Sequence, residues 1–250
     1  GSDYLNPQIQ LIIDEMIDTT EKSRLNLYLQ NWIDDKIETE LKSLVDLRNV
    51  KDKNPELRAL AFHLYENNGV VKRDEVLSYL NKLNQDERKK MRNLGVKFGR
   101  YHIFLFKLFK PSSVSLRILL WKNFNEKNFD FLPPTFGLNF LEENKVLNKH
   151  LMLLCGFEKF ENLYVRIDIL ERLFLMIFNT KSENKIKEIK LIPEMLNLLG
   201  CNKENFMKLI KKMNYKIYEK NNNLHFKYIP LRRAIKKNSN KKIEDNPFNI

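Results

Sequence analysis

The residues of this 250-residue chain that could do chemistry are cations set among aromatic rings. Ten Lys and Arg residues lie between Arg88 and Lys122, and neither Asp nor Glu occurs between Glu87 and Glu126. Cations neutralise phosphates and rings stack on unpaired bases, so this mixture is typical of a surface for single-stranded nucleic acid. The side chains that we predict to make these contacts are Lys97, Arg100, Tyr101, His102, Lys107 and Lys110.

Some of the rings in this segment could instead belong to a hydrophobic core. Phe98, Phe104 and Phe106 lie at the spacing of a β-strand, where a ring is more often buried than stacked on a base. The three residues that follow Gly99, residues 100–102, are the better candidates for exposure. The segment therefore indicates a polyanion partner and says nothing about sequence preference.

A second cluster of cations lies near the C-terminus. Lys208, Lys211 and Lys212 are three and four residues apart, so they share one face of a helix predicted over 203–213. Such a face can bind nucleic acid, bind a protein or simply be solvated, and the sequence leaves these alternatives open. The predicted nucleic-acid contacts of this cluster are Lys208, Lys211, Lys212, Lys216, Lys227, Arg232 and Arg233.

The sequence lacks the common motifs for catalysis. It contains no G-x-x-x-x-G-K-[ST] phosphate loop, no G-x-G-x-x-G and no G-x-S-x-G. The four histidines never fall at metal-ligand spacing with one another or with the cysteines. Cys155 and Cys201 stand in apolar surroundings and are expected to be small buried hydrophobes. We therefore expect no catalysis, no metal and no cofactor in this chain.

The net charge of +12 is distributed unevenly. Residues 1–50 hold 5 basic and 10 acidic residues, residues 51–180 hold 22 and 15, and residues 181–250 hold 17 and 7. A polyanion is the natural partner of such an excess, because each neutralised phosphate releases condensed counterions. Compositional drift toward Lys, Asn and Ile is the alternative source of the charge, although it explains the clustering less well.

Two further features of the sequence concern the compartment. No apolar run is long enough to span a bilayer, so we expect no membrane contact. Two cysteines do not make a disulfide framework, which favours a reducing, cytoplasmic location.

The periodicity of apolar residues predicts a mainly α protein with short β-hairpins, in which a helical domain is followed by a winged-helix-like C-terminal domain. The predicted domains are a helical domain over 3–125 with its basic aromatic segment at 88–124, a linker over 126–149, a winged-helix-like domain over 150–232 and a basic disordered tail over 233–250. The expected helices are two long ones within 7–48 and shorter ones over 56–66, 72–83, 86–94, 111–121, 167–178, 193–199 and 203–213, with strands or a loop in 96–109 and hairpins over 157–165 and 215–229.

Several strings resemble the region downstream of the motor in the mitochondrial degradosome RNA helicase family and its bacterial relatives. The most distinctive string is LGVKFGRYHIFLFKLFKP at residues 94–111, followed by SLRILLWK. The strings LRALAFHLYENNGVVKRDEV, YVRIDILERL and MLNLLGCNKENFMKLIKKMNY are also similar, so the resemblance extends from about residue 25 to residue 233. One departure is Phe106, where the family pattern leads us to expect a proline.

This resemblance implies an accessory region of a superfamily II, ATP-dependent RNA helicase. Such helicases carry ATP and Mg²⁺ in two RecA-like motor domains, and nothing in this chain matches them. The implied partners are RNA or another single-stranded nucleic acid, the upstream motor domains and a nuclease. The alternative is a docking scaffold for the motor or the nuclease, and a stand-alone hydrolase is the least favoured hypothesis.

Overall fold

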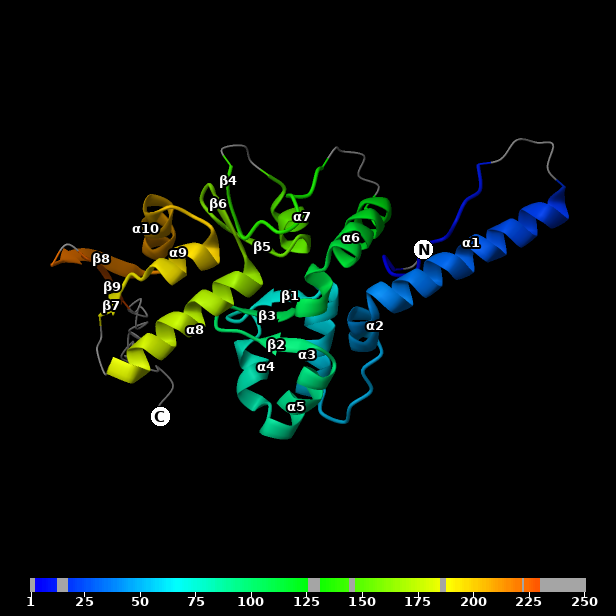
Figure 1. Ribbon diagram of the computed structural model, residues 1–250. Helices are drawn as coiled ribbons and strands as arrows, with labels where there is room; N and C mark the ends of the chain where they lie inside the picture. Colours follow the sequence, from blue (N-terminus) through cyan, green and yellow to red (C-terminus); the bar gives the residue numbers. More distant parts are fainter. Residues whose placement is uncertain are drawn as a thin grey trace, which may run out of the picture.

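The computed structural model describes residues 3–12, 18–125, 131–143, 147–184, 188–221 and 223–229. The protein is mixed α/β, with about 54% helix and three small antiparallel sheets of three strands each. Figure 1 shows helix α1 projecting from one side of the body, while the hairpin of the third sheet lies at the opposite end. In the described part of the chain, no helix is both long and apolar enough to cross a membrane.

The N-terminal part consists of helices α1 (Thr19–Glu40) and α2 (Lys42–Arg48). The prediction of helix from residue 7 was wrong, because residues 7–12 form no regular structure, and residues 13–17 lie outside the described ones. The Gln30 side chain holds this segment against α1. Its oxygen accepts from the Ile9 N–H at 3.2 Å, and its amide donates to the Pro7 carbonyl at 3.1 Å.

The first sheet belongs to a unit in which strand β1 is followed by two helices and a hairpin. Its strand order is β1-β3-β2. Asn54 caps its first helix, and Asn84 forms a capping box with Glu87 at its third. The helix predicted over 72–83 is shorter than expected, because residues 70–72 pair with β3. The elements are α3 (Pro55–Glu66), β1 (Val70–Lys72), α4 (Leu77–Lys82), α5 (Gln85–Asn93), β2 (Val96–Phe98) and β3 (His102–Leu105).

The second sheet follows a short 3-10 helix and has the order β4-β6-β5. Pro111 begins α6, as its fixed φ favours the first helical turn. The hairpin predicted over 157–165 is confirmed, with Glu161 at a φ of 58° in its turn. The segment expected to be a linker supplies strand β4, which pairs with β6. The elements are η1 (Phe106–Phe109), α6 (Pro111–Phe124), β4 (Phe140–Glu142), α7 (Lys149–Leu154), β5 (Phe157–Phe160) and β6 (Leu163–Arg166).

The third sheet has the order β7-β9-β8 and completes a unit that begins with a long helix. Gly200, at a φ of 71°, ends α9 in the left-handed conformation that favours glycine. The hairpin predicted over 215–229 is confirmed. The elements are α8 (Ile167–Asn184), β7 (Ile189–Lys190), α9 (Pro193–Leu199), α10 (Lys203–Lys212), β8 (Tyr215–Lys220) and β9 (Asn223–Tyr228).

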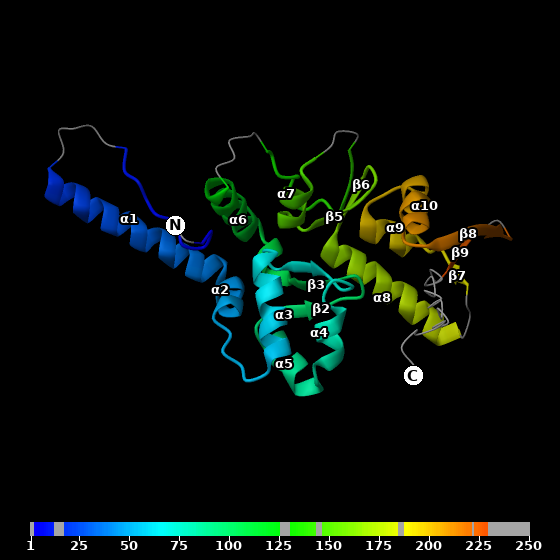
Figure 2. The same cartoon turned by 180° about the vertical axis from the view of Figure 1, so that it is seen from behind.

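The three units share one topology. In each unit a helix precedes a strand, a second helix precedes a hairpin, and the first strand pairs with the last. The first and third units have one more helix between the strand and the hairpin. Seen from both sides, α8 runs alongside the first sheet, which brings the third unit against the first (Figures 1 and 2).

Candidate nucleic-acid groove

A groove of about 570 Å³ lies between the first sheet and helix α8. Strand β2 and the β2–β3 turn form one wall, and the outward face of α8 forms the other. Four cationic side chains and two carboxylates, those of Asp168 and Glu171, line it, together with aromatic and aliphatic groups. The cations are Arg73, Lys97, Arg100 and Arg172, and the apolar residues are Phe98, Phe104, Phe106, Phe174 and Leu175.

Rings and cations meet directly along the groove. The Arg100 guanidinium lies 5.7 Å from the centre of the Phe174 ring, at cation–π range. Phe106 and Leu175 are about half exposed, at 48% and 56%, so both apolar side chains are open to a ligand. Lys97 is exposed on β2. The groove thus combines positive charge with apolar surfaces on which a flat group can stack.

The β2–β3 turn at Arg100 and Tyr101 is held in place by a carboxylate from the third unit. Glu171 on α8 accepts hydrogen bonds from the backbone N–H groups of Arg100, Tyr101 (2.8 Å) and His102 (3.0 Å). A Cβ added at Gly99 would stand 2.6 Å from Glu171 Oε1, so only glycine leaves room for the carboxylate. Arg73 adds a hydrogen bond from its guanidinium to the Gly99 carbonyl at 2.9 Å.

A buried ion cluster lies beneath this turn, where the three units meet. His102 Nε2 is 2.9 Å from Glu158 Oε2, and its Nδ1 is 3.8 Å from Glu171 Oε1. Lys72 pairs with the other oxygen of Glu158 at 3.0 Å. Two carboxylates and two cations therefore balance in charge when His102 is an imidazolium. The cluster joins β3 of the first unit, β5 of the second and α8 of the third.

The pKa values of the cluster follow from this balance. Burial lowers the pKa of His102, but hydrogen bonds and charge from Glu158 and Glu171 outweigh burial and raise it above its ordinary value. Burial likewise raises the pKa of both carboxylates, but the partners prevail and lower it: His102 and Lys72 for Glu158, and His102 with the three backbone N–H groups for Glu171.

The structure places the predicted residues of the basic aromatic segment in different settings. Lys97 and Arg100 line the groove. Lys107 and Lys110 are exposed in another cleft, of about 310 Å³, beside Glu40 at the end of α1. The segment therefore does not present all of its cations to one ligand-binding surface.

The expectation that residues 100–102 are exposed was wrong for His102, which is 3% exposed in the ion cluster. Tyr101 is half-buried and packs edge-on against Phe174 at 5.7 Å, while Arg100 is exposed. Phe104 is a core residue, whereas Phe106, for which burial was the favoured alternative, is exposed. The reason is that strand β3 ends at Leu105, so Phe106 begins the 3-10 helix η1 and does not share the strand alternation of Phe104.

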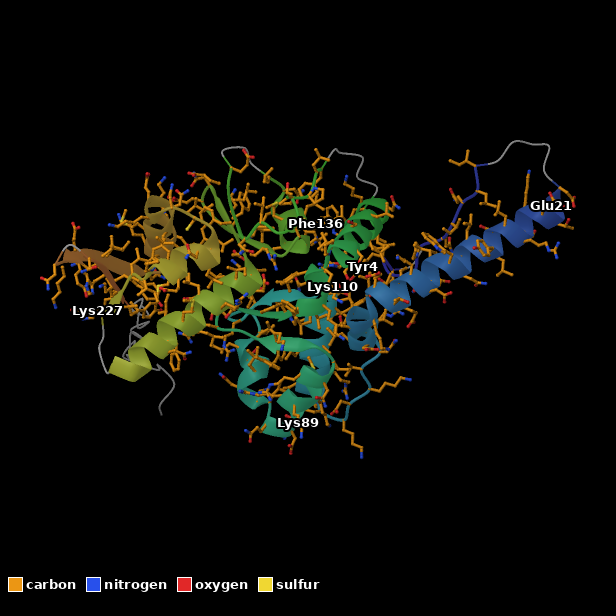
Figure 3. All side chains as sticks on the ribbon, viewed as in Figure 1. Tyr4, Glu21, Lys89, Lys110, Phe136 and Lys227 are labelled. Carbon is orange, nitrogen blue, oxygen red and sulfur yellow. The ribbon has the colours of Figure 1, made fainter. Side chains whose placement is uncertain are left out.

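The C-terminal lysines are partly engaged within the protein. Lys208 on α10 pairs with Glu204 at 3.1 Å and lies 3.8 Å from Glu142, and Lys212 pairs with Glu161 in the β5–β6 turn. Lys211 is exposed, as are Lys216 and Lys227, which face each other across strands β8 and β9. Figure 3 shows Lys227 at the end of the molecule remote from α1. Arg232 and Arg233 lie outside the described residues.

One cation of the basic segment, Arg117 on α6, is buried and takes no part in a surface. Its guanidinium donates to the carbonyls of Asn68 (2.9 Å), Leu108 (2.5 Å) and Leu154 (2.7 Å), at the ends of α3, η1 and α7. Burial lowers its pKa to about 10, so it remains charged at neutral pH. Its positive charge is well placed, since helix C-termini carry partial negative charge.

Residue-by-residue analysis of the sequence missed the groove residues on β1 and α8. Arg73 follows β1, while Glu171, Arg172 and Phe174 lie on α8, about seventy residues from β2 along the chain. The spacing of residues along the sequence does not indicate that these four side chains lie close to β2 in the folded protein. The signal that could have found Arg73, Glu171 and Arg172 is that they fall inside the strings VVKRDEV and YVRIDILERL, which the sequence analysis had singled out.

No group of three His, Cys, Asp or Glu side chains that could hold a metal ion occurs among the described residues. Burial raises the pKa of the Cys155 thiol to about 12 and that of Cys201 to about 11, so neither is poised as a nucleophile. In comparisons with known proteins, no family model, curated protein or solved structure matches this chain.

Proposed function

We propose that this chain is an accessory nucleic-acid-binding region of an ATP-dependent RNA helicase, and that its groove binds single-stranded RNA. The observation that supports this most is the groove itself, where four cations lie beside the exposed apolar side chains of Phe106 and Leu175. Phosphates of a single strand meet the cations and its bases stack on the rings, with little sequence readout. ATP and Mg²⁺ would bind in the separate motor domains, because this sequence has no phosphate-binding loop.

The third unit supports the same proposal through its topology. The third unit has the element order α8, β7, α9, α10, β8, β9 and the strand order β7-β9-β8, which is compatible with the winged-helix-like domain that we propose, and the first unit repeats it. Because α10 is partly engaged with the second unit, we assign the third unit mainly to building the groove wall through α8.

The test is binding of a fluorescent 12-nucleotide single-stranded RNA, followed by anisotropy over a series of salt concentrations. Log affinity should fall linearly with log salt, with a slope of up to about −3 if all four groove cations meet phosphates, at about 0.7 per contact for a single strand. RNA affinity that is undetectable at low salt, or that does not change with salt concentration, would contradict the proposal.

A double variant locates the contact. Arg100→Ala with Arg172→Ala removes two exposed groove cations, and the slope should become shallower by about 1.4. The matched control is Lys51→Ala with Lys53→Ala, which lowers the net charge equally at exposed positions before α3. Equal losses in the two double variants would mean that overall charge, rather than the groove, binds the RNA.

A second candidate function, a docking scaffold for the motor or a nuclease, is favoured by helix α1. This helix projects from the body (Figure 1) and exposes Leu25, Tyr28 and Trp32 beside the acidic pair Asp34 and Asp35. Triple substitution of the three apolar residues by Ala should abolish capture of the motor fragment in the absence of RNA and leave RNA affinity unchanged. Capture at wild-type levels would exclude α1 as the docking element.

A further inference from the structure

The repeated topology assigns the same position to three helices, α5, α7 and α10. Each one directly precedes the hairpin of its unit. In helix-turn-helix proteins the helix at this position enters the major groove of duplex DNA. The three helices differ, however, in what covers their outward faces.

Two of the three helices are engaged inside the molecule. On α10, the Asn205 side-chain amide donates to Glu142 at 2.8 Å, Lys208 lies 3.8 Å from Glu142, and Lys212 pairs with Glu161, so this helix contacts the second unit. On α7, Leu151, Met152 and Leu154 are buried. Neither helix can enter a groove of DNA without giving up these contacts.

Helix α5 has the opposite character. Met91 faces the core, and four of its charged residues make local contacts. Glu87 belongs to the capping box, Arg88 donates to the Leu80 carbonyl at 2.6 Å, Lys90 pairs with Asp52 at 2.7 Å, and the Arg92 guanidinium lies 5.7 Å from the centre of the Phe98 ring. The outward face carries exposed amide and cationic side chains. These are Gln85, Lys89, Arg92 and Asn93, and the carboxylate of Asp86 in the first turn is exposed beside them.

The position and chemistry of this face suit a large polyanion. Helix α5 lies at one extremity of the body in both views, and Lys89 extends from it into solvent (Figures 1, 2 and 3). Lys97 is exposed on the next strand, and Asn93 borders the cleft that contains Lys107 and Lys110. Amide side chains pair with adenine, Arg and Lys pair with guanine, and flanking lysines neutralise phosphates.

We propose that α5 is a second nucleic-acid site, distinct from the single-strand groove, that binds double-stranded DNA with the Gln85–Asn93 face in the major groove. The major groove of B-form DNA admits a helix, whereas that of A-form RNA is too deep and narrow for its bases to be read. The site goes beyond the proposed function and does not depend on it.

The test compares three labelled probes: a random-sequence 20-base-pair DNA duplex, the RNA duplex of the same length and single-stranded RNA. The double variant Gln85→Ala, Lys89→Ala keeps good helix formers in α5 and leaves the groove residues intact. We expect the variant to lose about ten-fold in affinity for the DNA duplex and nothing for single-stranded RNA. Methylating guanine N7, which lies in the major groove, should weaken wild-type binding to the DNA duplex.

The outcomes separate this site from the groove. Failure of the wild type to bind the DNA duplex, wild-type duplex affinity in the double variant, equal affinity for the RNA duplex or indifference to N7 methylation would each overturn the α5 site. Loss of binding to single-stranded RNA in the Arg100→Ala, Arg172→Ala variant, but not in the α5 variant, tests the groove and leaves the α5 site unaffected. Superimposable circular dichroism spectra and melting curves would show that the α5 variant folds.

Discussion

Replacing His102 by Gln tests whether the ion cluster holds the three units together. The substitution removes the cation between Glu158 and Glu171, so Glu158 keeps only Lys72 as an ion-pair partner and Glu171 keeps only its three backbone N–H donors. Breaking a buried ion pair by removal of one member costs about 3–5 kcal/mol, and because Lys72 is retained we expect about 3 kcal/mol of unfolding free energy to be lost at pH 6.

The pH dependence of that loss is the sharper part of the prediction. A histidine whose pKa is raised on folding stabilises the protein fully below its unfolded pKa of about 6.5, and this contribution is lost as the pH rises through the folded value. The two carboxylates have the opposite pH dependence. Because folding lowers their pKa values, they stabilise the protein above their unfolded pKa of about 4.3, and this stability is lost only as the pH falls through the folded values. The stability that the cluster loses as the pH rises is therefore that contributed by the His102 imidazolium.

The assay is urea unfolding followed by circular dichroism at several pH values from 5.5 to 9. The difference in unfolding free energy between wild type and His102→Gln should be largest at low pH and shrink as the pH rises, by at most about 1.4 kcal/mol per pH unit for one proton. His63→Gln is the matched control, since His63 contacts Tyr79 outside the cluster. A difference that stays constant or widens with pH would refute the reasoning.

Three further predictions concern single residues. Arg117→Met should lower the free energy of unfolding by about 3 kcal/mol in urea titrations, because three buried carbonyls lose their donor, and an unchanged midpoint would contradict this role. Gly99→Ala should displace the Glu171 carboxylate and speed hydrogen exchange at the amides of the β2–β3 turn, whereas unchanged exchange would show that the turn tolerates a Cβ. Cys155 and Cys201 should react with iodoacetamide at pH 8 much more slowly in the folded protein than in urea, as followed by mass spectrometry, because burial raises both thiol pKa values; equal rates would contradict that burial.

Several elements could be predicted from the sequence because their signals are local. Pro55 and Pro111 mark the starts of α3 and α6, and Gly200 marks the end of α9, since each residue type suits that position whatever surrounds it. The hairpin over 157–165 was predicted from the Glu161-Asn162 turn, and the hairpin over 215–229 from alternation on both sides of an Asn run. The absence of the helix predicted over residues 7–12 shows the limit of such local signals. Helical spacing of apolar residues does not say whether another element packs against the apolar face.

The groove could be predicted only in part, as a concentration of cations and rings around Gly99. The sequence by itself determined that Arg88–Phe124 carries positive charge without acids, and that the chain lacks a phosphate-binding loop. Tertiary structure decided that Arg117 is buried, that His102 joins two carboxylates and that α8 supplies the other wall. The physical reason is that charge and local turns are properties of neighbouring residues, whereas exposure and ion pairing depend on which distant element packs against them.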